Sequence, residues 1–304
     1  MIIPAPADLA GRYRVSNGSR FRLKDIDPAD PWGKRLKPIA NQILKQGRRT
    51  MAGLQERLYA QDRWSVLLIF QAMDAAGKDG TIKHVMAGVN PQGCEVHSFK
   101  APSAEELDHD FLWRPNNALP RRGHIGIFNR SYYEETLVVR VHQNILAKQQ
   151  LPAGLVTKNI WRERFEDINA YERYLSRQGV LVRKFFLHVS KDEQAKRFLE
   201  RLAKPEKHWK FSPADVGERA HFASYMAAYE DMIRHTATES APWYVVPADR
   251  KWFTRLIVSS AIIEALESVD PQFPEVDPKV RSEFKRLSAA LQAERRPRTK
   301  VRKK

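Results

Sequence analysis

Residues 64–83 constrain the fold more strongly than any other stretch of this chain. Residues 66–70 form an unbroken apolar run of strand-forming side chains, which is typical of a strand buried on both faces of a parallel sheet. A turn with two glycines follows, and apolar residues then recur at helical spacing over residues 82–89. Because such a turn leaves backbone N–H groups free at the positive end of a helix, the stretch predicts a phosphate-binding loop.

The loop matches the pattern G-x-x-x-x-G-K-[ST] with two departures. Ala72 replaces the first glycine, and Asp79 follows Lys78 at the place where a hydroxyl residue normally holds Mg²⁺. We expect Asp74, inside the loop, to supply an oxygen ligand to Mg²⁺ and Lys78 to reach the transferring phosphate. The alternative is a glycine turn that only caps a helix, which the strand before it and the helix after it argue against. The other loop residues that we expect to bind phosphate or nucleotide are Ala75, Ala76, Gly77, Asp79, Gly80 and Thr81.

The charge of the chain indicates a polyanionic partner. Its 304 residues carry a formal net charge of +16, which favours nucleic acid, a membrane face or a phosphate-rich substrate. Cys94 is the only cysteine, so a disulfide framework is excluded, and we expect a reducing, cytoplasmic location. No apolar run approaches the length of a membrane span, and the start of the chain is too short and uncharged for a signal peptide.

Strands that alternate with helices predict an α/β fold of three layers with a mainly parallel, five-stranded sheet. The expected strands are residues 66–70, 94–100, 124–128, 180–189 and 243–246. The predicted organisation is an N-terminal arm with amphipathic helices over residues 1–62, a core over residues 63–269 with a helical lid at about residues 190–235, and a basic tail over residues 270–304.

Two segments outside the core, residues 33–62 and residues 295–304, have their own sequence patterns. Residues 33–62 predict one long amphipathic helix or two shorter helices broken near Gly47, and their apolar face either packs on the protein's own body or forms a dimer contact. Seven of the residues 295–304 are Lys or Arg, so we expect a solvated, disordered arm there.

The end of the strand at residues 124–128 is a second candidate site. In P-loop proteins a carboxylate at the tip of a neighbouring strand holds Mg²⁺, but here Asn129 occupies that place and adds no charge. Arg130 directly after it is suited to bidentate phosphate binding, and Glu134 lies one turn later on the same cleft. The alternative is a helix cap beside a surface arginine.

A basic connector between two helices lies between the fourth and fifth strands, where nucleotide kinases carry a lid. A lid excludes water and lowers cations onto the phosphates, whereas the alternative is a solvated pair of charged helices. The cations that we expect to contact a polyanion are Arg197, Arg201, Lys204, Lys207 and Lys210 from the lid, and Lys83, Arg121 and Arg122 from the walls of a basic groove. Asp249, after the fifth strand, either contacts the nucleotide or caps the next helix.

Together these motifs resemble the polyphosphate kinase type-2 family over about residues 32–266. The resemblance rests on residues 73–83, 128–131, 184–194, 205–210 and 247–249. It implies a P-loop kinase fold and Mg²⁺-dependent transfer of phosphoryl groups from inorganic polyphosphate to AMP or ADP, which gives ADP and ATP. A homo-oligomer, either a dimer or a tetramer, is expected.

The resemblance also implies roles for single residues. The positions to which it assigns Mg²⁺ binding, catalysis and lid contacts are Asp74, Lys78, Arg130, Arg197 and Arg201. Many members have Asp at the strand tip and Asn a few residues later, whereas this chain has Asn129 and Glu134. That departure is similar to the subgroup that accepts both nucleoside mono- and diphosphates, and it leaves Asp74 as the principal carboxylate for Mg²⁺.

Two rival functions differ from this expectation. An ATP-dependent nucleotide kinase of the thymidylate-kinase type would use the same loop without polyphosphate. A nucleic-acid-binding protein would use the charge of +16, but the sequence has no RNP-like, zinc-finger or helix-turn-helix signature. We therefore expect polyphosphate, AMP, ADP and ATP as partners, and neither a membrane nor a nucleic acid.

Overall fold

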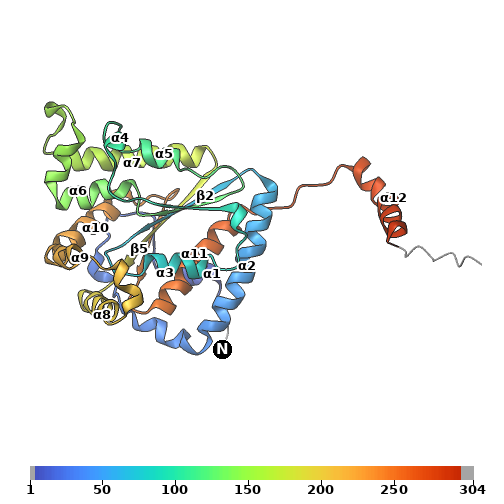
Figure 1. The fold of residues 1–304 in the computed structure, drawn as a ribbon, viewed down its shortest axis with the longest axis horizontal. Helices are drawn as coiled ribbons and strands as arrows, with labels where there is room; N and C mark the ends of the chain where they lie inside the picture. The colour runs from blue at the N-terminus through green and yellow to red at the C-terminus, as the bar shows by residue number, and fades with distance from the viewer. Residues whose placement is uncertain (1–3, 296–304) are drawn as a thin grey trace, which may run out of the picture.

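The computed structural model describes residues 4–295 and has a largely parallel sheet at its centre (Figure 1). The strand order is β1-β6-β5-β2-β4-β3, and all neighbours are parallel except β1 and β6. The strands are β1 (Arg14–Val15), β2 (Ser65–Gln71), β3 (Cys94–Ser98), β4 (Ile125–Asn129), β5 (Val180–His188) and β6 (Trp243–Pro247). All seven residues of β2 are buried, which confirms the strand predicted from its apolar run.

Helices cover both faces of the sheet, as the alternation of elements predicted (Figure 1). One face carries α1 (Pro6–Gly11), α2 (Ala40–Gln61), α3 (Lys78–Val85) and α11 (Lys251–Glu267). The other face carries α6 (Val138–Val141), α7 (Ile160–Arg177) and α10 (Phe222–Thr236). The three-layer α/β architecture is thereby confirmed.

Several short elements connect these layers. The short α-helices are α4 (Ala104–Leu107), α5 (Trp113–Asn117) and α9 (Pro213–Gly217), and α8 (Lys191–Leu202) is a longer helix that follows β5. The 3₁₀ segments are Leu23–Asp25, Pro31–Ile39, Pro91–Gly93, Tyr132–Thr136, Gln143–Gln149, Ala153–Leu155, Pro205–Lys210 and Glu218–His221. The stretch between β5 and β6 therefore consists of α8, a 3₁₀ segment, α9, a second 3₁₀ segment and α10.

The prediction of five strands was wrong by one, because β1 is a sixth strand at the edge of the sheet. Val15 of β1 lies opposite Trp243 of β6 in an antiparallel pair. A strand of two residues is too short to show a period-two pattern, so no periodicity in the sequence could reveal it. The N-terminal arm is also more integrated than predicted, since Leu9 and Tyr13 are buried in the core.

The amphipathic region before the core is one continuous helix rather than two. α2 runs through Gly47, and a Cβ atom at this glycine would lie 3.1 Å from Ser259 Oγ of α11. The glycine therefore allows α2 and α11 to approach closely instead of breaking α2. The packing of α2 on α11 accounts for its apolar face within the chain itself.

A helix that the sequence analysis did not predict lies beyond the core. α12 (Pro278–Glu294) has no buried residue and projects away from the body at the red end of the chain (Figure 1). Its apolar residues are spaced four, three and four positions apart at Val280, Phe284, Leu287 and Leu291. The expected basic arm falls on residues 295–304, of which all but Arg295 lie outside the described residues. Among the described residues, none of the helices has the length and apolar character needed to span a membrane.

We predict that Gly47 tolerates a large side chain far less well than Gly53 in the same helix. Gly47→Leu should lower the free energy of unfolding by about 1–3 kcal/mol, because the new side chain forces α2 away from α11. Gly53→Leu should be neutral or stabilising by up to about 1 kcal/mol, since a Cβ atom at Gly53 meets nothing within 4 Å and Leu is the better helix former. Urea denaturation measures both values. Equal stability of the two variants would contradict the close approach.

Candidate active site

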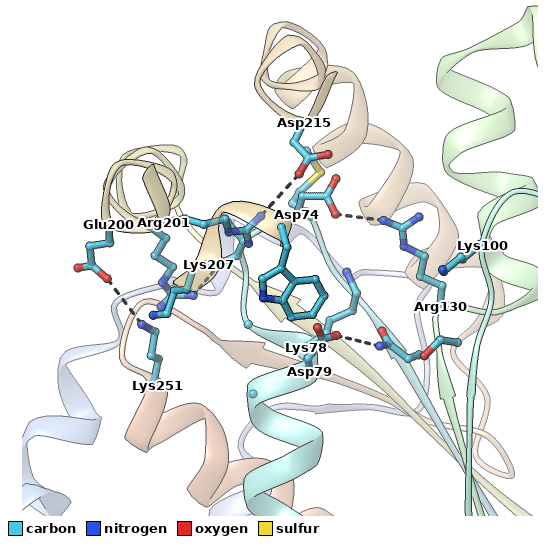
Figure 2. A pocket seen from close by; sticks show the side chains of 18 of the residues that line it. Asp74, Lys78, Asp79, Lys100, Arg130, Glu200, Arg201, Lys207, Asp215 and Lys251 are labelled. Atoms are coloured by element: carbon cyan, nitrogen blue, oxygen red, sulfur yellow. Dashed lines mark hydrogen bonds and ion pairs between the residues drawn. The ribbon is translucent and has the colours of Figure 1, made fainter. Parts of the chain in front are cut away.

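The carboxyl ends of β2 and β4 meet at a cavity of about 620 Å³ (Figure 2). The phosphate loop (residues 72–77) joins the end of β2 to the start of α3 and forms the floor of this cavity. This is the position at which open α/β sheets bind ligands. The other lining residues are Ser98, Phe99, Lys100, Asn129, Arg130, Arg197, Glu200, Arg201, Lys207, Trp209, Asp215 and Lys251, with Lys78, Asp79 and Gly80 from α3.

The backbone of the phosphate loop has a left-handed conformation at two residues, which Ala76 separates. Gly77 has φ +102° and Ala75 has φ +61°. Glycine adopts such a conformation freely, but a non-glycine residue persists in it only where the surrounding structure holds it, as happens at functional sites. Gly77 therefore adopts its conformation by its own preference, whereas Ala75 must be held by the residues around the loop.

Lys78 lies at the first position of α3 and extends into the site. Its Nζ atom donates to the Ala72 carbonyl oxygen at 2.8 Å, and only 9 % of the residue is exposed. Burial lowers the pKa of Lys78, and the positive charge of Arg130 adds to this effect. The ammonium group is thus held at the first residue of the loop, beside the cavity (Figure 2).

Asp74 and Arg130 form an ion pair in the wall of the cavity. Arg130 Nη2 donates to Asp74 Oδ1 at 3.1 Å, and both side chains are partly exposed. Arg130 has φ +65°, a left-handed conformation that the backbone bond from its N–H to the Phe70 carbonyl oxygen at 3.0 Å helps to hold. Asp74 and Arg130, which follow two different strands in the sequence, therefore meet as one ion pair, and this pair also lines a second cavity of about 40 Å³.

Asn129 and Glu134 also reach the site, by different contacts. Asn129 Nδ2 donates to Asp79 Oδ1 at 2.9 Å, so the strand tip of β4 holds the first turn of α3. Glu134 lines the smaller cavity, and burial raises the pKa of its carboxyl group although Arg130 opposes this shift. The amide nitrogen of Gln71 donates to Glu134 Oε1 at 2.8 Å, and its amide oxygen accepts from the Ser131 hydroxyl at 3.1 Å.

A buried polar cluster anchors the segment that follows Arg130. Glu172 Oε1 accepts hydrogen bonds from the hydroxyls of Tyr132 at 2.9 Å and Tyr133 at 2.8 Å. Lys184 Nζ donates to Glu172 Oε2 at 2.6 Å, and both charged side chains are at most 1 % exposed. Because a buried charge that loses its partner is strongly destabilising, this cluster fixes the two tyrosines and with them the backbone that carries Arg130.

The predicted lid cations divide into two groups. Arg201 and Lys207 line the cavity, and Arg201 lies 3.6 Å from Asp215 of α9 (Figure 2). Arg197 also lines the cavity, but its guanidinium group is buried and donates to backbone carbonyl groups. Lys204 is exposed and is not among the residues that line the cavity. The side chain of Lys210 lies outside the described residues.

The predicted groove residues Arg121 and Arg122 lie at the wrong end of the sheet. They precede the first residue of β4, whereas the phosphate loop lies at the end where this strand finishes. Arg122 Nη1 donates to the Arg63 carbonyl oxygen at 2.7 Å, before β2 begins. Lys83 is exposed in the last turn of α3 and does not line the cavity. None of these three residues therefore lines the cavity that the phosphate loop forms.

Asp249 lies outside the cavity lining and does not cap α11. It does not line the cavity, and the N-cap residue of α11 is Arg250, which makes no side-chain cap. Asp249 Oδ1 instead accepts a hydrogen bond from the Ser190 backbone N–H at 2.8 Å. It therefore joins the loop after β6 to the start of α8.

Sequence reasoning missed several residues that line the cavity. Lys100, Trp209, Asp215 and Lys251 all face it, and Trp209 is 78 % exposed. Trp209 lies inside a motif that was recognised, between two lysines, so its neighbourhood was a usable signal. Lys100 is the last residue of the expected second strand and Lys251 comes shortly after the expected fifth strand, so a search of all strand ends for cations would have found them.

Comparison with known proteins agrees with this geometry. The family model described as "Polyphosphate kinase 2 (PPK2)" matches residues 37–274. An ADP-polyphosphate phosphotransferase of Rhodopseudomonas palustris is 50 % identical over 282 residues, which cover 92 % of this chain and 97 % of that protein. An AMP/ADP-polyphosphate phosphotransferase of Meiothermus ruber is 45 % identical over 273 residues, which cover 90 % of this chain and 97 % of that protein.

A solved structure shows the same fold. The crystal structure of polyphosphate kinase 2 from Arthrobacter aurescens TC1 superposes with a TM-score of 0.84 at 38 % sequence identity, covering 97 % of this chain and 98 % of that one. The family model spans most of the chain, and the relatives match almost from end to end. This chain therefore belongs to the polyphosphate kinase 2 family.

Proposed function

We propose that this chain is a polyphosphate:nucleotide phosphotransferase that moves phosphoryl groups from inorganic polyphosphate to AMP, ADP or both, with ADP and ATP as products. The observation that carries the proposal is the phosphate loop with Lys78 at its mouth and the Asp74–Arg130 pair beside it. The relatives named as ADP- and AMP/ADP-polyphosphate phosphotransferases support the choice of substrates.

The charges around the cavity suit two polyanionic substrates. Phosphoryl transfer requires mainly that donor and acceptor are aligned and that the charge on the transferring group is neutralised. Lys78 and the loop N–H groups would hold one phosphate chain, and Arg130 would bind the group in transfer. Lys100, Arg201, Lys207 and Lys251 supply further positive charge around the same space.

Mg²⁺ is the metal that we propose, with Asp74 as its protein ligand. The described residues contain no group of three or more His, Cys, Asp or Glu side chains able to enclose a metal. Mg²⁺ is usually bound through one or two carboxylates together with substrate phosphates, so a single well-placed aspartate fits its chemistry. When bound, the ion would neutralise charge on the phosphate chains. Its binding to Asp74 would compete with Arg130.

The segment at about residues 190–235 would act as the lid within a core of residues 63–269. Arg201, Lys207 and Trp209 belong to it and face the cavity, so its closure would exclude water and bring cations onto the phosphates. Residues 1–62 and 270–304 would flank this core. The proposal includes a cytoplasmic location and a homo-oligomer, a dimer or a tetramer, whose size gel filtration measures.

The first prediction concerns the phosphate donor. Purified protein incubated with ADP, inorganic polyphosphate and Mg²⁺ should form ATP, and with AMP it should form ADP. Chromatographic separation of the nucleotides measures both products. If nucleotides are phosphorylated by ATP but not by polyphosphate, the protein is instead an ATP-dependent nucleotide kinase.

The second prediction concerns the two loop side chains. Asp74→Ala and Lys78→Ala should each lower kcat about 10²-fold or more, because each removes charge stabilisation of the transferring group. Lys45→Ala, an exposed cation on α2, is the matched control and should keep the wild-type rate. Steady-state rates of ATP formation decide the matter. Near-normal turnover in either loop variant would refute the assignment.

The third prediction concerns pH. Because the pKa of Lys78 is lowered and the ammonium form is the one that binds phosphate, kcat/KM should begin to fall on the alkaline side below the pH at which an ordinary lysine titrates. Lys78→Arg should be slower but should lack this alkaline fall, since a guanidinium group keeps its proton over the same range. A pH profile of kcat/KM that is the same for both proteins would mean that another group titrates.

A further inference from the structure

One face of α8 contacts three consecutive carbonyl groups of the phosphate loop. Gln194 Nε2 donates to the Asp74 carbonyl oxygen at 2.9 Å. Arg197 Nη1 donates to the carbonyl oxygens of Ala76 at 2.7 Å and Ala75 at 3.3 Å. Because residues three positions apart lie on the same side of a helix, one helix face reaches the whole turn.

The remaining donors of Arg197 are directed at other protein groups. Its Nη2 atom donates to the carbonyl oxygens of Ala248 at 2.6 Å and Asp249 at 3.2 Å, and its Nε atom donates to Glu193 at 2.8 Å. A guanidinium group has five N–H donors, so the contacts with the loop, with the end of β6 and with Glu193 account for all of them. Arg197 is 6 % exposed, which leaves its charge paired and covered.

These contacts set the direction of the loop N–H groups. In a planar peptide unit the C=O and the following N–H point in opposite directions. Holding the carbonyl groups of Asp74 and Ala76 toward α8 therefore turns the N–H groups of Ala75 and Gly77 away from it. The same hydrogen bonds from α8 explain how Ala75, a non-glycine residue, is kept at φ +61°.

We propose that Gln194 and Arg197 are positioning residues that give the phosphate loop its binding shape, and that Arg197 is not a ligand of polyphosphate. Gln194 is itself oriented, because its Oε1 atom accepts from Arg219 Nη1 at 2.7 Å and only 1 % of the residue is exposed. Since α8 is also the first helix of the lid, lid and loop are joined by the same two side chains. The proposal rests on the proposed function, in which this loop binds phosphate.

The salt dependence of polyphosphate affinity distinguishes a residue that braces the loop from one that binds polyphosphate directly. The Kd of inorganic polyphosphate of one chain length is measured by calorimetry over a series of NaCl concentrations, and kcat is measured with ADP. Removing a cation that contacts a phosphate lowers the magnitude of the slope of log K against log[salt], because fewer counterions are released on binding. Removing a brace weakens binding but leaves the slope unchanged.

The variants are Arg197→Ala, Arg197→Lys and Gln194→Met. Arg201→Ala is the comparison, because Arg201 lines the same cavity with a more exposed side chain that pairs with Asp215. All three α8 variants should lower kcat by about a hundredfold, because a misplaced loop misaligns the reacting groups. Their slopes of log K against log[salt] should equal that of the wild type. Arg197→Lys keeps the charge but cannot span both sets of carbonyl groups, so it should not rescue kcat. Arg201→Ala should lower the magnitude of the slope.

Lys196→Ala is the matched control for charge, since the side chain of this neighbour of Arg197 is 67 % exposed and is not among those that line the cavity. It should leave both kcat and the slope unchanged. If circular dichroism shows that Arg197→Ala is unfolded, Gln194→Met and Arg197→Lys still test whether α8 positions the loop.

Two results would overturn the inference. One is that Arg197→Ala lowers the magnitude of the salt slope as much as Arg201→Ala does. The other is that Gln194→Met keeps the kcat of the wild type. Failure of the proposed function looks different, because the wild-type protein itself would then form no ATP from ADP and polyphosphate.

Discussion

The shape of the phosphate loop is the constraint on which the rest of the site depends. Its backbone includes a left-handed alanine, so the loop needs support from outside its own residues. Support comes from the buried strand β2 on one side, from α8 through Gln194 and Arg197 on another, and from Asn129, which holds Asp79 at the start of α3. Elements far apart in the chain thus converge on one turn.

The positive charge of the cavity is balanced by a small number of acids. Asp74 lies 3.1 Å from Arg130, Asp215 lies 3.6 Å from Arg201, and Glu200 lies 3.9 Å from Lys251 (Figure 2). Each of these pairs is partly exposed, so each is weak and is easily exchanged for a contact with a polyanion. The buried pair of Lys184 and Glu172 behaves differently, since it is covered and serves to fix the backbone behind Arg130.

The sequence could predict the centre of this site because its signals are local. An apolar run, two glycines and a lysine are enough to place a buried strand, a phosphate loop and the start of a helix, and Asn129 and Arg130 follow another such run. The side-chain roles of cations elsewhere depend on tertiary packing. The sequence marks Arg197 and Arg122 as charged but does not show that one is buried under the loop and the other lies at the opposite end of β4.

The measurement that tests the central claim most directly is a crystal structure of the protein with inorganic polyphosphate and Mg²⁺. The account predicts phosphate oxygens within hydrogen-bonding distance of Lys78 Nζ and of the N–H groups of the phosphate loop, with the Arg197 guanidinium still on the carbonyl oxygens of Ala75 and Ala76. Phosphates bound elsewhere, or a phosphate loop flattened with the Asp74 side chain turned out of the cavity, would contradict it.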